Sequence, residues 1–175
     1  MAIDWENFLD PYIQAVGELK IKLRGIRKQY RKQQKHSPIE FVTGRVKPIE
    51  SILEKMERRS ISEENLAQDM QDIAGLRIMV QFVDDVDEVL EVLRKRQDMR
   101  VVQERDYIRH KKSSGYRSYH VVVEYPVDTI NGYETILASC IGPVTACLIR
   151  YSGYEPRKVC TASSGFPTST MAVPA

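Results

Sequence analysis

Hydrophobic residues recur at spacings of three and four near the start of the chain, which predicts a long amphipathic helix over Asp4–Gln34. A second helix is predicted from about Lys47 to Arg59, with Pro48 in its first turn, where a missing N–H costs nothing. The residues at 60–63, Ser-Ile-Ser-Glu, have the form of a capping box. They predict a third, short helix that reaches about Met70.

The pattern changes after Gly75 to segments typical of strands. Strands are predicted at 76–82, 101–104, 119–125 and from 133 to 138, and a helix is predicted at 84–96. Asn131-Gly132 is a strong turn signal between the last two strands. The order of elements predicts an α+β fold in which helices flank a mixed β-sheet.

The composition is that of a globular protein with one domain: 175 residues, 42% hydrophobic and 29% charged. No apolar stretch approaches the roughly 20 residues that cross a bilayer, and the first residues are acidic and helix-like, unlike a signal peptide. We therefore expect a cytoplasmic protein.

The chain changes character at residue 139. The segment 139–175 contains only four charged residues, and it holds all three cysteines, Cys140, Cys147 and Cys160, at spacings that fit no usual zinc site. This predicts a domain over 1–138 and a separate tail over 139–175, a break typical of a frameshift, a read-through or a fusion.

Two stretches place cations where phosphates bind. Arg45, Lys47 and Ser51 lie at a loop-to-helix junction, and Arg58 follows two turns later; a helix N-terminus with its free N–H groups favours phosphate. The alternative is a solvated basic helix start. In the second stretch, Arg105 to His120, cations alternate with tyrosines, which suits a nucleotide or nucleic acid. The alternative there is a polar loop followed by a strand with core tyrosines.

A carboxylate and a cation flank the start of the first predicted strand. Asp72 could hold a Mg²⁺ that binds phosphates, and Arg77 could neutralise phosphoryl charge. The alternative is a surface ion pair between the two. The basic run Lys20–Lys35 is either a solvated helix face or a surface for a polyanion such as RNA.

Four segments together resemble a known family. They are Ile39–Lys47, Asp72–Arg77, Arg105–Ile108 and Ser114–His120. Over about residues 4–138 they are similar to the nucleotidyltransferase-like synthetase domain of bacterial small alarmone synthetases of the RelA/SpoT type. This resemblance implies a GTP pyrophosphokinase, which transfers the β,γ-diphosphate of ATP to the 3′-hydroxyl of GTP or GDP and makes pppGpp or ppGpp in the stringent response.

The resemblance also implies roles for particular residues. Asp72 would be the catalytic residue that holds Mg²⁺. ATP would be bound by Arg45, Lys47, Ser51, Arg58 and Arg77. The guanosine nucleotide would be bound by Arg105, Lys112, Tyr116 and His120, with the ring of Tyr116 stacked on guanine.

The family further implies a homotetramer with a central cleft that binds alarmone. Positions that match this cleft are Lys20, Arg24, Arg27, Glu40, Phe41 and Thr43. Some members bind single-stranded RNA, which makes it a further expected partner.

The chain departs from the family after Ala138. Ser139 stands where the family has the glutamate of a Glu-x-Gln-Ile-Arg-Thr motif, thought to help activate the 3′-hydroxyl. Glu134 lies five residues earlier and is expected on the opposite face of the sheet. We therefore expect an impaired synthetase with one sheet face partly uncovered, and hence poor solubility. The alternative is a non-catalytic module that binds alarmone or RNA.

Overall fold

The computed structural model describes residues 3–110, 113–114, 116–130 and 132–142. Its longest element is helix α1, Trp5–Lys32, which confirms the predicted first helix. The carboxylate of Asp4 begins the helix by accepting a hydrogen bond from the backbone N–H of Asn7 at 3.3 Å. One stripe of α1, which includes Tyr12, Val16 and Leu19, is buried.

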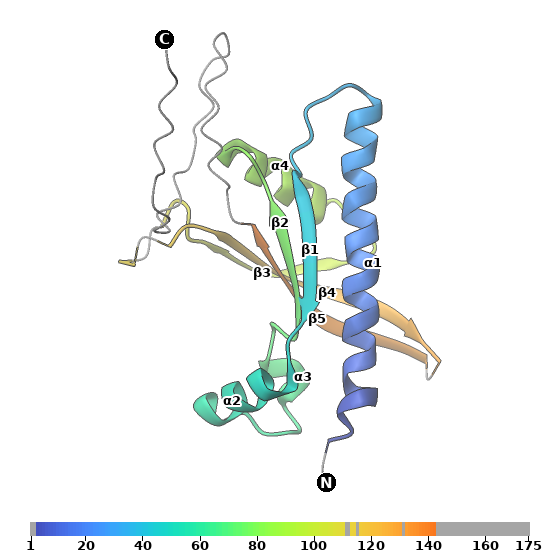
Figure 1. The fold of residues 1–175 in the computed structure, drawn as a ribbon, viewed down its shortest axis with the longest axis vertical. Coiled ribbons are helices and arrows are strands. Elements are labelled where there is room, and N and C mark those ends of the chain that lie inside the picture. The colour runs from blue at the N-terminus through green and yellow to red at the C-terminus, as the bar shows by residue number, and fades with distance from the viewer. Residues whose placement is uncertain (1–2, 111–112, 115, 131, 143–175) are drawn as a thin grey trace, which may run out of the picture.

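The centre of the protein is a five-stranded sheet with the strand order β1-β2-β5-β4-β3 (Figure 1). Its strands are β1 (Phe41–Val46), β2 (Ala74–Met79), β3 (Arg100–Asp106), β4 (Tyr119–Thr129) and β5 (Gly132–Gly142). Neighbouring strands are antiparallel except β2 and β5, which are parallel, so the prediction of a mixed sheet is confirmed.

Residues 41–46 form strand β1, which the sequence did not predict, since it placed Arg45 at a loop-to-helix junction. This strand is short and at the edge of the sheet, it contains Gly44, and its burial alternates only weakly, so its sequence lacks a clear strand pattern. Strand β5 also extends beyond Ala138: residues 139–142 pair with β2 and β4, although the sequence placed them in the tail. The rest of the tail lies outside the described residues.

The shorter helices are α2 (Ile49–Arg59), α3 (Leu66–Asp69) and α4 (Val83–Arg94). Pro48 is the N-cap of α2, one position before the first turn where it was expected. The predicted capping box is wrong, because Ser60 instead ends α2 in a left-handed conformation with φ 52°. Helix α3 therefore begins only after Asn65, and no side chain caps it.

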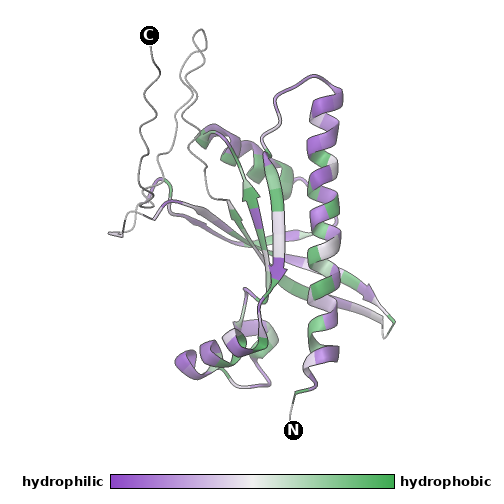
Figure 2. Ribbon diagram, in the orientation of Figure 1, coloured by the Kyte–Doolittle hydropathy of each residue, from purple (hydrophilic) through white to green (hydrophobic). Residues whose placement is uncertain are grey.

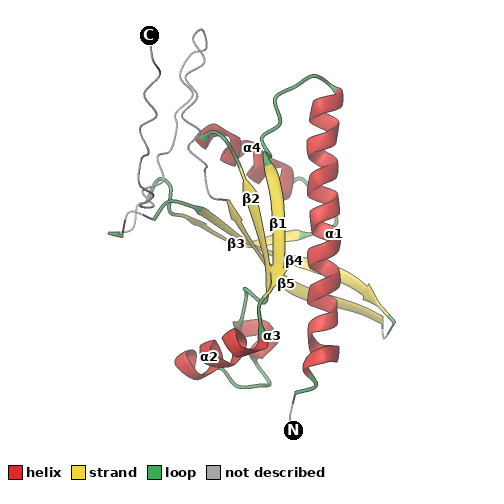
Figure 3. Cartoon of the chain, in the orientation of Figure 1, coloured by secondary structure: helices red, strands yellow, loops and turns green. Residues whose placement is uncertain are grey.

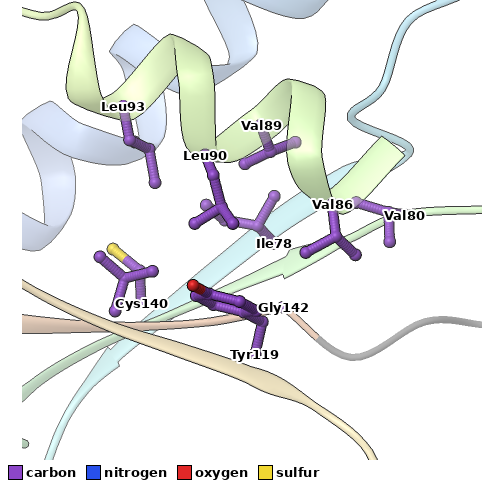
Figure 4. A pocket seen from close by; sticks show the side chains of 10 residues that line it. Ile78, Val80, Val86, Val89, Leu90, Leu93, Tyr119, Cys140 and Gly142 are labelled. Atoms are coloured by element: carbon purple, nitrogen blue, oxygen red, sulfur yellow. The ribbon is translucent and has the colours of Figure 1, made fainter. Parts of the chain in front are cut away.

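Helices α1 and α4 pack on the same face of the sheet (Figure 3). Leu90 and Leu93 of α4 point towards Ile78, Tyr119 and Cys140 of the sheet, as Figure 4 shows. Only about 20 Å³ of free space remains between these residues, so α4 packs closely on the sheet.

Hydrophilic residues dominate the C-terminal half of α1 (Figure 2). Among the described residues no helix is both long enough and apolar enough to span a membrane.

Candidate active site

A cleft of about 440 Å³ opens on the sheet face opposite α1, where the ends of β1, β2 and β5 meet the link to α2. The residues that line it are Thr43, Gly44, Arg45, Lys47, Asp72, Gly75, Leu76, Arg77, Ser139 and Ile141. Four residues predicted from the sequence, Arg45, Lys47, Asp72 and Arg77, therefore lie in one cleft. Three of them are cations, which makes the cleft suitable for an anion.

Asp72 lies between two lysines, two residues before strand β2 begins. Its Oδ2 accepts from Lys47 Nζ at 3.0 Å, and its Oδ1 pairs with Lys55 Nζ at 2.5 Å. A backbone hydrogen bond from Lys47 N to the carbonyl of Ile73, 2.8 Å long, holds this link against the start of β2. Burial raises the pKa of the Asp72 carboxyl, but Lys55 and Lys47 outweigh it and lower this pKa below its usual value.

Lys55 is the site residue that sequence reasoning missed. Its side chain is only 12% exposed, and it reaches Asp72 from helix α2. The signal was present, since Ser51, Lys55 and Arg58 share one helical face while Ile52 and Met56 on the other face are buried. Lys55, Ser51 and Arg58 are not themselves among the residues that line the cleft, and of the three only Lys55 is paired with Asp72.

Asp72 does not form the alternative ion pair with Arg77. Its two carboxylate oxygens instead pair with Lys47 and Lys55. Arg77 instead occupies the middle of the cleft lining, on β2. No ion pair to Arg77 occurs within the part of the chain that the structure describes.

Strand pairing aligns the predicted residues across the sheet. One row of directly paired residues crosses all five strands: Thr43, Arg77, Ile141, His120 and Arg105. A second row on the same face consists of Arg45, Gly75, Ser139, Val122 and Gln103. Arg45 and Arg77, predicted for ATP, and Arg105, predicted for the guanosine nucleotide, thus lie on one face. The first two are near the β1 end of these rows and Arg105 is at the β3 end.

Aromatic residues gather at the β3–β4 end of this face. The hydroxyl of Tyr116 lies 2.9 Å from Nε2 of His120, and the two ring centroids are 5.8 Å apart. The two side chains are therefore in direct contact. Lys112 lies outside the described residues.

Ser139 and Glu134 take opposite sides of strand β5. Ser139 lines the cleft, between Gly75 on β2 and Val122 on β4. Glu134 lies on the face of the sheet that α1 covers, close to Tyr12 of α1. Burial and, to a smaller extent, the negative charge of Glu134 raise the pKa of Tyr12 to about 12. Glu134 therefore cannot supply the carboxylate that Ser139 lacks.

The residues predicted for an alarmone cleft are not all on one surface of the single chain. Arg24 of α1 donates to the carbonyl of Val42 at 3.4 Å, and Lys20 lies close to Gly44. Thr43 lies on the opposite face of β1 and lines the cleft described above. Phe41 shares the face of Thr43, by the alternation of the strand, and is 44% exposed.

Comparison with known proteins identifies the class to which this fold and cleft belong. The family model of a region found in RelA / SpoT proteins matches residues 44–137, and the chain belongs to this family. Among curated proteins, the GTP pyrophosphokinase YjbM of Bacillus subtilis (strain 168) is 60% identical over 133 residues. These residues make up 76% of this chain but only 63% of YjbM, so the chain spans less than two thirds of that relative.

Solved structures show the same fold. A GTP pyrophosphokinase family protein from Streptococcus pneumoniae aligns with a TM-score of 0.80 and 76% identity, over 82% of this chain and 71% of that one. The small alarmone synthetase 1 of Bacillus subtilis, bound to its product pppGpp, aligns with a TM-score of 0.77 and 57% identity, over 80% of this chain and 73% of that one. The resemblance and the fold class inferred from the sequence are both confirmed.

Proposed function

We propose that this chain is a GTP pyrophosphokinase domain that binds ATP and a guanosine nucleotide side by side and transfers the β,γ-diphosphate slowly. The observation that carries this proposal is the paired row across the sheet, with Arg77 at one side and His120 and Arg105 at the other. Strands are about 4.8 Å apart, so Arg77 and His120 are separated by roughly 10 Å, which suits two nucleotides that meet at their phosphates.

The ATP half of the proposal rests on charge. Lys47 and Lys55 contact the carboxylate of Asp72, and Arg45 and Arg77 line the same cleft. This excess of positive charge over a single carboxylate matches a triphosphate. Ser51 and Arg58 share a face of α2 with Lys55 and are proposed as further contacts to the phosphates. When a triphosphate binds, its oxygens replace the carboxylate as partners of the two lysines.

The same carboxylate fits Mg²⁺. Asp72 is the only carboxylate among the described residues that line the cleft, so it would be a single protein ligand. Mg²⁺ that accompanies nucleotides is typically held by one or two carboxylates, and water and phosphate oxygens complete its shell. The ion would neutralise charge on the transferred phosphoryl groups.

The proposed site for the guanosine nucleotide lies at the β3–β4 end of the same sheet face. Arg105 and His120 are paired neighbours on β3 and β4, and Tyr116 lies against His120 with its side chain 41% exposed. An exposed ring beside two polar groups suits a base that stacks while its phosphates meet the cations. Lys112 is proposed as a further phosphate contact.

The chemistry that this arrangement supports is a displacement at the β-phosphorus of ATP. The 3′-oxygen of the guanosine nucleotide bonds to this phosphorus, AMP leaves with the bridging oxygen, and the proton of the 3′-hydroxyl passes to a base. Positioning and charge neutralisation supply most of the rate in such transfers. The hydroxyl of Ser139 is a far weaker base than the family's carboxylate, so we expect slow transfer.

Product formation tests the proposal. The purified chain is incubated with ATP, GTP and Mg²⁺, and pppGpp is measured by anion-exchange chromatography. We expect weak activity that Asp72→Ala abolishes. Ser139→Glu should raise it by about tenfold or more, while Ser139→Gln, which has the same size without the charge, should not. Robust turnover of the unaltered chain would contradict the claim of impairment, and unchanged synthesis by Asp72→Ala would remove Asp72 from the site.

A second function, a non-catalytic module for RNA or alarmone, is favoured by the basic half of α1. Of the cations in the run Lys20–Lys35, only Lys22 forms an ion pair with another described residue, Asp98. Affinity for single-stranded RNA that falls linearly with rising salt on a log–log plot would support this function. No measurable binding at low salt would exclude it.

A further inference from the structure

Tyr107 is the third member of an aromatic cluster whose other members are Tyr116 and His120. Its ring meets the ring of His120 edge-on, with centroids 5.2 Å apart and an interplanar angle of 89°. It also meets the ring of Tyr116 with centroids 6.2 Å apart. Since Tyr116 and His120 are themselves in contact, each of the three rings touches the other two.

The backbone of Tyr107 is fixed by its neighbours. Its N–H donates to the carbonyl of Ser118 at 3.0 Å, which continues the β3–β4 pairing one residue beyond β3. The next two residues turn sharply, because Oδ1 of Asp106 accepts from the N–H groups of Ile108 and Arg109, both at 2.9 Å. The side chain of Ile108 is buried and anchors the turn in the core.

An ion-pair bridge then fastens this turn to helix α4. The guanidinium of Arg109 donates to Asp106 at 2.8 Å and to Asp87 of α4 at 2.7 and 2.9 Å. Arg109 and Asp87 are both about half exposed, so the ion pair between them adds little to stability but restricts where the turn lies. The position of the Tyr107 ring is thus set from the strand on one side and from α4 on the other.

We propose that Tyr107 is a positioning residue of the guanosine-nucleotide site, which acts through Tyr116 and His120. The inference rests on the proposed function, in which Tyr116 stacks on guanine. A ring that is held by a neighbour before the ligand arrives loses less conformational freedom on binding than a mobile ring. Without the Tyr107 ring, Tyr116 gains freedom that the base must then remove.

The test is calorimetric binding of GDP and of a non-hydrolysable ATP analogue to the full chain. Tyr107→Leu should weaken GDP binding by about threefold to tenfold, while Tyr107→Phe, which keeps the ring and loses only the hydroxyl, should retain it. Affinity for the ATP analogue should stay unchanged in both variants. The matched control is Tyr133→Leu, because Tyr133 is 72% exposed and pairs with Asp128 near the β4–β5 turn, at the other end of β4 from His120.

If Tyr107→Leu does not fold, a second variant, which leaves the Tyr107 ring in place and removes the ion pair that holds its turn, keeps the test decisive. Asp87→Asn removes the anchor on α4 and should weaken GDP binding by about twofold, with the far-ultraviolet circular dichroism of the unaltered chain. Full GDP affinity in Tyr107→Leu, or an equal loss in Tyr107→Phe, would overturn the inference while the proposed function stands. An unaltered chain that binds the ATP analogue but no GDP would overturn the guanosine site and this inference with it.

Discussion

Gly44 of strand β1 faces helix α1 and leaves little room for a side chain, so replacing it tests the packing that shapes the cleft. A Cβ atom at this position would lie 2.8 Å from Cγ1 of Val16, 3.2 Å from Cδ of Lys20 and 3.4 Å from the carbonyl oxygen of Gly75. Carbon atoms pack best at about 3.5–4.0 Å. The long side chain of Lys20 can move away, but Val16 is buried, branched at Cβ and held in one rotamer by the helix.

Gly44→Ala therefore has to lift α1 from β1 by several tenths of an ångström. Overpacking of this kind costs about 1–3 kcal/mol, so we expect the free energy of unfolding to fall by about 2 kcal/mol. For a chain of this length about 2 kcal/mol corresponds to a melting temperature about 4–8 °C lower. Because Gly44 lies in the cleft lining beside Arg45, affinity for an ATP analogue should fall as well.

Urea denaturation followed by circular dichroism measures the effect. Gly17→Ala is the matched control: Gly17 is an exposed residue of α1, nothing lies within 4 Å of its added Cβ, and alanine should stabilise the helix by about 1 kcal/mol. Adding Val16→Ala to Gly44→Ala removes the clashing atom, so the two changes should cost less together than their sum. A Gly44→Ala chain as stable as the unaltered one, with the control behaving as expected, would refute the reasoning.

Three further predictions concern acid stability, thiol reactivity and assembly. Hydrogen bonds from Arg96, and to a smaller extent from Lys22, lower the pKa of Asp98 from its usual 3.8 to about 2, although partial burial acts in the opposite direction. The contribution of Asp98 to stability is therefore present above about pH 4 and is lost as the pH falls towards about 2. The urea midpoint should therefore fall less over this range in Asp98→Asn, and an equal fall would contradict the role of Asp98. Burial raises the pKa of the Cys140 thiol to about 12, so Cys140 should resist iodoacetamide in the folded chain and react once unfolded, as mapped by mass spectrometry; equal rates would show that it is accessible. We expect light scattering to detect non-native association, and a monodisperse tetramer would contradict this expectation.

Much of the fold followed from local patterns, because a helix or strand with one buried face repeats its hydrophobic residues at a fixed spacing. Helices α1 and α4 and strand β4 were predicted in this way. Strand β1 was missed, since it is a short edge strand whose pairing with β2, not its own composition, keeps it extended. The start of α3 was misplaced because Ser60, which resembled an N-cap, is needed to end α2.

The chain itself determined which groups are available: the cations Arg45, Lys47 and Arg77, the carboxylate of Asp72, and a serine at position 139. Only the tertiary structure decided how they meet. Lys55 reaches Asp72 because the link before α2 is hydrogen-bonded, through the N–H of Lys47, to the carbonyl of Ile73, the residue that follows Asp72. Ser139 and Ile141 join the cleft because β5 returns from about 60 residues later and inserts parallel to β2, between β2 and β4. Local spacing carries no information about such pairings, since the hydrogen bonds that fix them join strands far apart in the chain.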